Sequence, residues 1–136
     1  MTALRMVHAL LWVWFGLNFV GVPRLVSRET LLGIAGALFA GTTAIAIAYV
    51  AGWWRAAFLA LPMLLYWCWN QRRHWLFHFR GAPPEIVVKY RNLFGGNITI
   101  LRRQPGRVVP DAYHTILHVL LVADVVLTLL ACSRMM

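Results

Sequence analysis

Residues 30–54 read TLLGIAGALFAGTTAIAIAYVAGWW and contain no charged side chain. A helix needs about 20 mostly apolar residues to cross the hydrocarbon core of a bilayer, so this stretch predicts a membrane-spanning helix over residues 30–52. Trp53 and Trp54 close the stretch, and Arg55 follows them. Tryptophan rings favour the level of the lipid headgroups, and we therefore expect this helix to end at a membrane surface.

The rest of the chain is similarly apolar. Of its 136 residues, 61% are hydrophobic, 13 are Lys or Arg and 4 are Asp or Glu, which gives a formal net charge of +9. A soluble domain carries far more charge, so we predict an all-α integral membrane protein that forms a single domain over residues 1–136. Further apolar runs complete a predicted set of four transmembrane helices, at residues 6–22, 30–52, 53–71 and 112–133.

The segment of residues 72–111 is the exception, because it holds eight of the thirteen Lys and Arg residues and is expected outside the hydrocarbon. Within it, the β-rich residues 86–90 and 98–101 flank Gly95 and Gly96, an arrangement that predicts a short β-hairpin. Basic side chains are attracted to an anionic leaflet by about 1 kcal/mol each. The residues expected to bind lipid headgroups are Arg72, Arg73, Arg80, Arg102 and Arg103.

The distribution of basic residues also predicts the orientation. Cytoplasmic loops of membrane proteins are enriched in Lys and Arg, and residues 72–111 together with Arg24 and Arg28 hold ten of the thirteen. We therefore expect the long loop in the cytoplasm and both termini outside it. The positive charge is then explained by topology, and nucleic acid is not expected as a partner.

Two histidine pairs have i, i+4 spacing. His74 and His78 follow the third predicted span, and His114 and His118 open the fourth. Residues four apart share one face of a helix, so we expect all four imidazoles at the cytoplasmic interface, as candidate ligands of haem, another pigment or a metal. The alternative for the first pair is an amphipathic stretch on the membrane surface. His8 is expected at the opposite surface.

Asp124 interrupts the last predicted span. A carboxylate near the middle of a bilayer costs on the order of 3 kcal/mol, so this one is expected to face the interior of the bundle. Helical periodicity places Thr128 on the same stripe as Asp124, and Asn18 of the first span is a candidate hydrogen-bond partner. Two interpretations remain open, an interhelical hydrogen bond or one member of a proton relay.

The second predicted span carries two series of small residues spaced by four. Small side chains let a neighbouring helix backbone approach closely inside a membrane. This face is expected to pack either within the bundle or against another subunit. Its residues are Gly33, Gly36, Ala37, Ala40, Gly41 and Ala44.

The sequence contains no Gly-rich phosphate loop, no serine elbow and no paired carboxylates within one segment, so independent catalysis is not expected. We expect a small non-catalytic, multi-pass membrane subunit that docks onto other membrane proteins in a larger assembly, such as an electron-transfer or photosynthetic complex. The competing hypothesis is a cofactor-binding membrane protein that uses the paired histidines. A third hypothesis is a small transporter or proton-conducting unit that uses Asp124.

Overall fold

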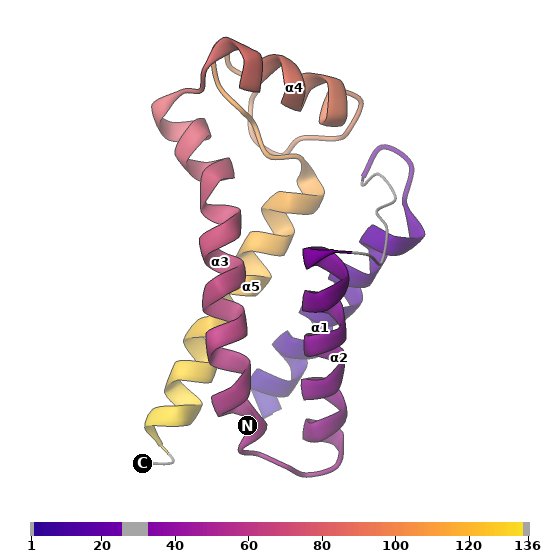
Figure 1. Cartoon of the computed structure of the whole chain (residues 1–136), viewed down its shortest axis with the longest axis vertical. Coiled ribbons are helices and arrows are strands. Elements are labelled where there is room, and N and C mark those ends of the chain that lie inside the picture. The colour runs from indigo at the N-terminus through magenta and orange to yellow at the C-terminus, as the bar shows by residue number, and fades with distance from the viewer. Residues whose placement is uncertain (1, 26–32, 135–136) are drawn as a thin grey trace.

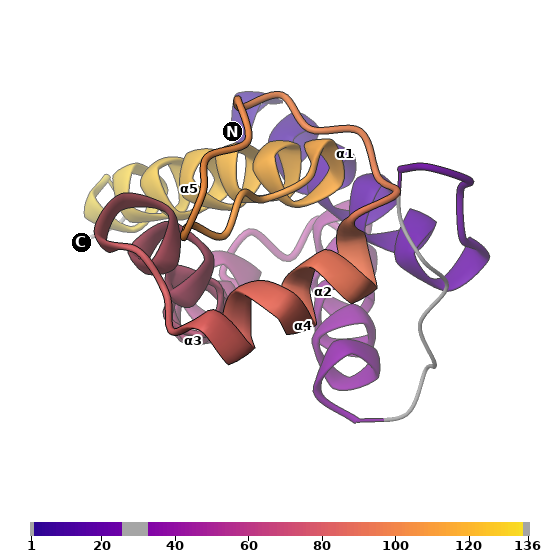
Figure 2. The same cartoon turned by 90° about the horizontal axis from the view of Figure 1, so that it is seen from above.

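The computed structural model describes residues 2–25 and 33–134, and over these residues the fold is helical. The helices are α1 (Thr2–Val20), α2 (Ile34–Val50), α3 (Ala56–Arg80), α4 (Pro84–Phe94) and α5 (Ala112–Ser133). Helices α1, α2, α3 and α5 form a bundle, and α4 lies across one end of it (Figures 1 and 2). The two chain ends and the α2–α3 turn lie at the opposite end (Figure 1).

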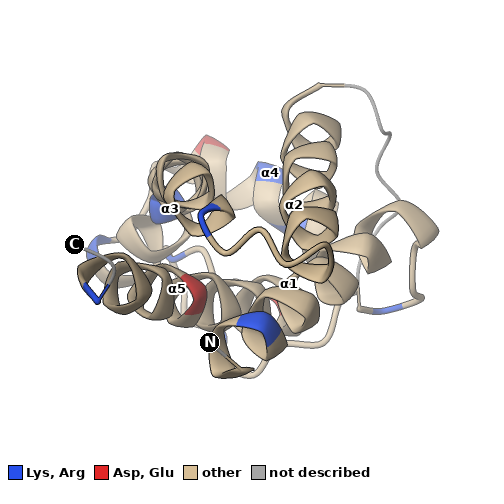
Figure 3. Cartoon of the chain, turned by 90° about the horizontal axis from the view of Figure 1, so that it is seen from below, with Lys and Arg blue, Asp and Glu red and all other residues tan. Residues whose placement is uncertain are grey.

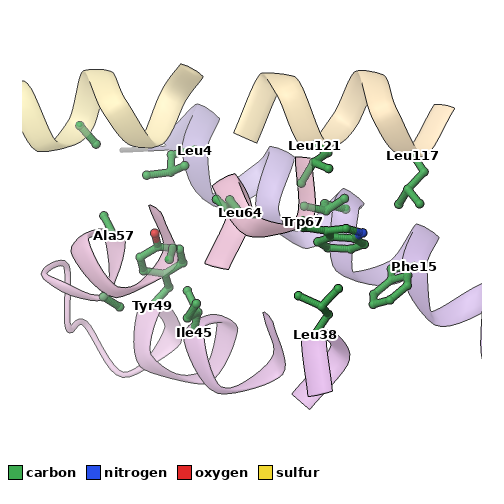
Figure 4. Packing of buried hydrophobic residues seen from close by; sticks show 14 of the residues in the cluster. Leu4, Phe15, Leu38, Ile45, Tyr49, Ala57, Leu64, Trp67, Leu117 and Leu121 are labelled. Atoms are coloured by element: carbon green, nitrogen blue, oxygen red, sulfur yellow. The ribbon is translucent and has the colours of Figure 1, made fainter. Parts of the chain in front are cut away.

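The bundle is held by apolar packing along four helix pairs. Helix α5 packs against α1 and α3, and α2 packs against the same two helices. Leu64 and Trp67 of α3 are almost fully buried in the middle of the bundle (Figure 4). Ala56, Ala57 and Ala60 have no exposed surface, because their small side chains let the neighbouring helices approach α3 closely.

Two helices, α1 and α5, are long and apolar enough to cross a membrane by their length and composition. This finding corrects the prediction of four transmembrane helices. Helix α2 has 17 described residues, fewer than a typical span, and the predicted start of that span at residues 30–32 lies outside the described residues. Charged positions are sparse along α1, α2 and α5 (Figure 3).

Helix α3 has the required length but not the required composition. It continues for 25 residues to Arg80, well past the predicted end of the span at Gln71. Its second half therefore includes polar and charged side chains such as Arg72 and Arg73, which disqualify it as an apolar span. The sequence places residues 72–80 in a loop because they are polar, but Arg and His are both compatible with a helix.

The predicted β-hairpin is wrong, because its first strand lies within helix α4. Pro84 occupies the first turn of α4, where a missing backbone N–H costs nothing, and Glu85 adds a negative charge that favours a helix N-terminus. Val87, Tyr90 and Phe94 are the less exposed positions, and their spacing is that of one helical face. In residues 86–94 the helical spacing of the apolar side chains predicts the structure better than the β-branched composition does.

The small residues of α2 divide between internal packing and the outer surface. Gly36 is buried, and a Cβ atom added at Gly41 would lie 2.6 Å from Sδ of Met63, so these glycines serve the contact of α2 with its neighbours. The remaining small residues of the set are exposed, namely Gly33, Ala37, Ala40 and Ala44.

Candidate functional site

A buried histidine–aspartate pair joins the two candidate membrane spans. Nδ1 of His8 in α1 lies 2.8 Å from Oδ2 of Asp124 in α5. His8 is 1% exposed and Asp124 is 0% exposed. A buried carboxylate without a partner is costly, so this contact explains how α5 tolerates an acid.

The second ring nitrogen of His8 determines where its protons lie. Nε2 is 3.3 Å from the backbone oxygen of Thr42 in α2, and a carbonyl oxygen only accepts hydrogen bonds. Nε2 of His8 is therefore placed to donate to this oxygen, while Nδ1 faces the Asp124 carboxylate. Both ring nitrogens of His8 thus face acceptor oxygens.

Other polar groups surround the pair. Thr128, with no exposed surface, donates its hydroxyl to Oδ1 of Asp124 at 3.4 Å. The Tyr49 ring of α2 meets the His8 ring edge-on at a centroid distance of 5.4 Å. The Tyr49 hydroxyl is buried and has no hydrogen-bond partner among the described residues. The Tyr49 ring therefore packs beside the His8–Asp124 pair, and its hydroxyl is an unsatisfied buried group within the described part of the chain.

The sequence prediction paired Asp124 with Asn18, and the structure places Asn18 elsewhere. Asn18 is buried and borders a separate cavity of about 140 Å³ that His114 also lines. The expectation that His8 lies at the membrane surface is wrong, because it depends on a first span that begins at residue 6. Helix α1 begins at Thr2, which moves His8 one turn further into the helix. The buried residues Leu4, Leu11 and Phe15 continue the same face.

At the α4 end of the bundle, three of the four predicted histidines come together. The ring centroid of His74 lies 4.9 Å from that of His114 and 5.5 Å from that of His118. Helix α4 covers this histidine cluster, because Tyr90 meets His74 edge-on and Phe94 meets His114 in the same way. Tyr90 and Phe94 are therefore part of the site that the sequence analysis missed.

Hydrogen bonds fix two of the three imidazoles. Asp111, 2% exposed, begins α5 by accepting from the backbone N–H of His114, and it also accepts from Nδ1 of His114 at 2.8 Å. Nε2 of His118 lies 3.0 Å from Oε1 of Gln71. Because the amide oxygen is an acceptor, the hydrogen of His118 is on Nε2 and its Nδ1 presents a lone pair.

Burial and the neighbouring imidazoles determine the charge of His74. Burial and the neighbouring rings of His114 and His118 lower its pKa from 6.5 to about 3. At neutral pH, His74 is therefore an uncharged imidazole with a free lone pair. Its Nδ1 atom is buried and has no hydrogen-bond partner among the described residues.

His78 does not join the histidine cluster. It is 8% exposed, and its Nδ1 donates to the backbone oxygen of Val108 at 3.2 Å. Arg107 in turn donates to the backbone oxygen of His78. His78 therefore fastens the end of α3 to the segment that leads to α5.

The cluster does not fit the haem alternative. The rings of His74 and His114 stack at an interplanar angle of 22°, which leaves no room for a porphyrin between them. Among residues 2–25 and 33–134, no group of three or more His, Cys, Asp or Glu side chains is arranged to hold a metal ion. A four-coordinate zinc site of the usual kind is therefore not formed here.

The arginines expected at lipid headgroups lie on the exposed surface around the α4 end. Arg72 stacks over the ring of Trp69 at 3.4 Å, and Arg103 donates to the backbone oxygens of Gly95 and Asn97. All five predicted positions are exposed, namely Arg72, Arg73, Arg80, Arg102 and Arg103.

An apolar layer separates the histidine cluster from the His8–Asp124 pair. His118 and Asp124 are six residues apart on α5, which corresponds to about 9 Å along the helix axis. Leu121 of α5 lies between these two levels, and Leu11 of α1 is one turn from His8 toward the α4 end; both are buried (Figure 4 shows Leu121 facing the bundle). The bundle therefore holds two polar sites with a dry layer between them.

These observations define a helical protein with two candidate membrane spans and two buried polar sites. No protein-family model, no curated protein and no solved structure matches this chain.

Proposed function

We propose that this chain is a small membrane protein that passes protons across the bilayer through the His8–Asp124 pair. The single observation that carries the proposal is this buried pair on the two candidate spans, in which both ring nitrogens of His8 face acceptor oxygens. One proton is then shared between Nδ1 and the carboxylate. Ionisable residues within a membrane are costly and usually serve ion or proton pathways.

The depth of Asp124 supports this function. It lies twelve residues after Ala112 and nine before Ser133, or about 18 Å and about 14 Å from the ends of α5. This position is well inside a hydrocarbon core of about 30 Å. A proton bound there is distant from both membrane surfaces, as a site on a conduction path requires.

The histidine cluster supplies neutral imidazoles nearer to the α4 end, as a second station on the path. Buried neutral imidazoles can relay protons, because one nitrogen accepts while the other donates. The apolar layer of Leu11 and Leu121 interrupts the path between the two stations. Conduction through this layer requires transient entry of water, and we therefore expect slow, gated proton flux.

For the topology, we propose that α1 and α5 cross in opposite directions, with both termini outside the cytoplasm. The support is the cluster of exposed arginines at the α4 end, because cytoplasmic segments are enriched in Lys and Arg. The arginine-rich end then faces the anionic lipids of the cytoplasmic leaflet.

Proton flux into proteoliposomes that contain a pH-sensitive dye tests the function. We expect Asp124→Asn to reduce the flux by at least tenfold, because the amide keeps the shape of the side chain but cannot take up the proton. Glu85→Gln, the same chemical change at an exposed acid on α4, should leave the flux unchanged. Equal flux through the wild type and Asp124→Asn would refute the proposal.

Docking onto a larger membrane assembly stays a prediction. The exposed small residues Ala37, Ala40 and Ala44 of α2 form the face expected to contact another membrane subunit. Co-purification in mild detergent tests it, since a chain that always migrates alone would count against such a subunit.

A further inference from the structure

Two buried nitrogen atoms in the histidine cluster lack hydrogen-bond partners among the described residues. They are Nδ1 of His74 on α3 and Nδ1 of His118 on α5. An unsatisfied buried polar atom is destabilising, and here two of them lie in neighbouring rings. Their ring centroids are 5.5 Å apart.

Both nitrogens are suited to bind a cation. The hydrogen of His118 is on Nε2, held by Gln71, so its Nδ1 has a lone pair without any loss of a proton. Nδ1 of His74 is buried and faces no acceptor among the described residues, so nothing holds a hydrogen on it.

The charge and donor set of the site select the ion. The Asp111 carboxylate is already engaged by His114 and Asn97, so no free carboxylate is present to neutralise a divalent ion. A monovalent ion costs less to bury. Copper is among the metals that imidazole binds, and its reduced form, copper(I), is monovalent.

We propose that His74 and His118 bind a single copper(I) ion between their Nδ1 atoms. Metal–nitrogen bonds of about 2 Å place two donor atoms about 4 Å apart, a separation that rings with centroids 5.5 Å apart provide when these nitrogens face each other. His114 stacks on His74 and orients it without acting as a ligand, because its Nδ1 is bound to Asp111. The site is independent of the His8–Asp124 pair.

Titration of the purified full chain with copper(I), under reducing and oxygen-free conditions against a chromophoric copper(I) chelator, tests the proposal. We expect one ion per chain, and at least tenfold weaker binding in His74→Phe and His118→Phe. Phenylalanine preserves the aromatic contacts of the cluster. The matched control is His78→Phe, which removes a histidine outside the cluster and should bind copper(I) as the wild type does.

X-ray absorption of the copper-loaded wild type provides a readout that does not depend on the folding of a variant. Two nitrogen ligands support the proposal. No binding, a coordination shell of sulfur from the cysteines, or equal affinity in all three variants would overturn it, and a buried water would then be the bridge between the two nitrogens. Because copper binding and proton flux are measured separately, either proposal can fail without the other.

Discussion

At the residue scale, a backbone carbonyl sets the chemistry of the His8–Asp124 pair. In the proposed arrangement, Nε2 of His8 donates to the Thr42 oxygen, which can only accept, and Nδ1 shares a proton with Asp124. Such a pair is neutral as a unit, which makes it tolerable inside an apolar bundle. Removing either member alone leaves a buried polar group without its partner.

A double-mutant cycle measures this dependence. Asp124→Leu alone is expected to lower the free energy of unfolding by about 3 kcal/mol, because it leaves Nδ1 of His8 buried and unpaired. Adding His8→Phe should recover most of that loss, since an apolar pair can replace a buried ionic pair. Unfolding in detergent micelles provides the measurement, and additive losses in the double variant would show that the two side chains do not interact.

Asp111 gives the chain a pH-dependent contribution to stability. Burial raises its pKa, but hydrogen bonds from His114 and Asn97 outweigh this effect and bring the pKa below the usual 3.8. Because the folded-state pKa is depressed, this contribution is fully present above about pH 3.8 and is lost as the pH falls through the lower folded-state value.

Thermal unfolding between about pH 6 and pH 2 checks this expectation. Asp111→Asn should flatten the acid limb of the stability profile while it keeps the start of α5, because Asn is as good an N-cap as Asp. Asp111→Ala should cost about 1 kcal/mol more than Asp111→Asn does at neutral pH. An unchanged acid limb in Asp111→Asn would assign the acid sensitivity to other groups.

Only part of the candidate site could be predicted at this scale. Asp124 was recognisable, because an acid in an apolar helix must face the interior. Its partner was not, since a shift of four residues in the start of α1 moves His8 from the surface into the helix. Asp111 has a signal in the sequence, an Asp just before a helix with His114 three residues later, but only the folded chain reveals its bond to Asn97.

At the element scale, helix boundaries decided what could be predicted. The apolar run at 112–133 coincides with α5, because Asp111 caps its start. The run at 53–71 did not give the end of α3, since polar residues extend the helix until Gly81, whose φ of +85° strongly favours glycine. Residues 86–90 of α4 resemble a strand in their β-branched composition, but the spacing of the less exposed side chains is that of a helix.

The contact of α2 with α3 offers a test of packing. Gly41→Val is expected to lower the free energy of unfolding by about 1 kcal/mol, because the flexible end of the Met63 side chain must move away from the added atoms. Ala40→Val introduces the same side chain at the adjacent exposed position and should change stability by about 0.5 kcal/mol or less. Equal effects of the two substitutions would mean that Gly41 does not serve this contact.

At the scale of the whole molecule, the charge is concentrated at one end and the buried polar groups lie at two levels. The sequence predicted that the positive charge is concentrated at one end, because the basic residues are clustered in one segment. It did not predict how many helices cross the membrane, since hydropathy alone does not separate a span from a buried or partly polar helix.

The proposed orientation predicts opposite labelling at the two ends of the bundle. In a background without Cys68 and Cys132, a cysteine at Ala3 should react with a membrane-impermeant thiol reagent in intact cells. A cysteine at Arg103 should react only after the membrane is opened. Both positions are exposed, so labelling of both from the same side would contradict the crossing of α1 and α5.

The shared proton of the His8–Asp124 pair is the central claim, and nitrogen NMR of the histidine-labelled full chain tests it most directly. We predict that His8 carries a hydrogen on Nε2 and that a strongly deshielded proton bridges Nδ1 to Asp124, a signal that disappears in Asp124→Asn. An unprotonated Nε2 on His8, or a His8 spectrum unchanged by Asp124→Asn, would contradict the account.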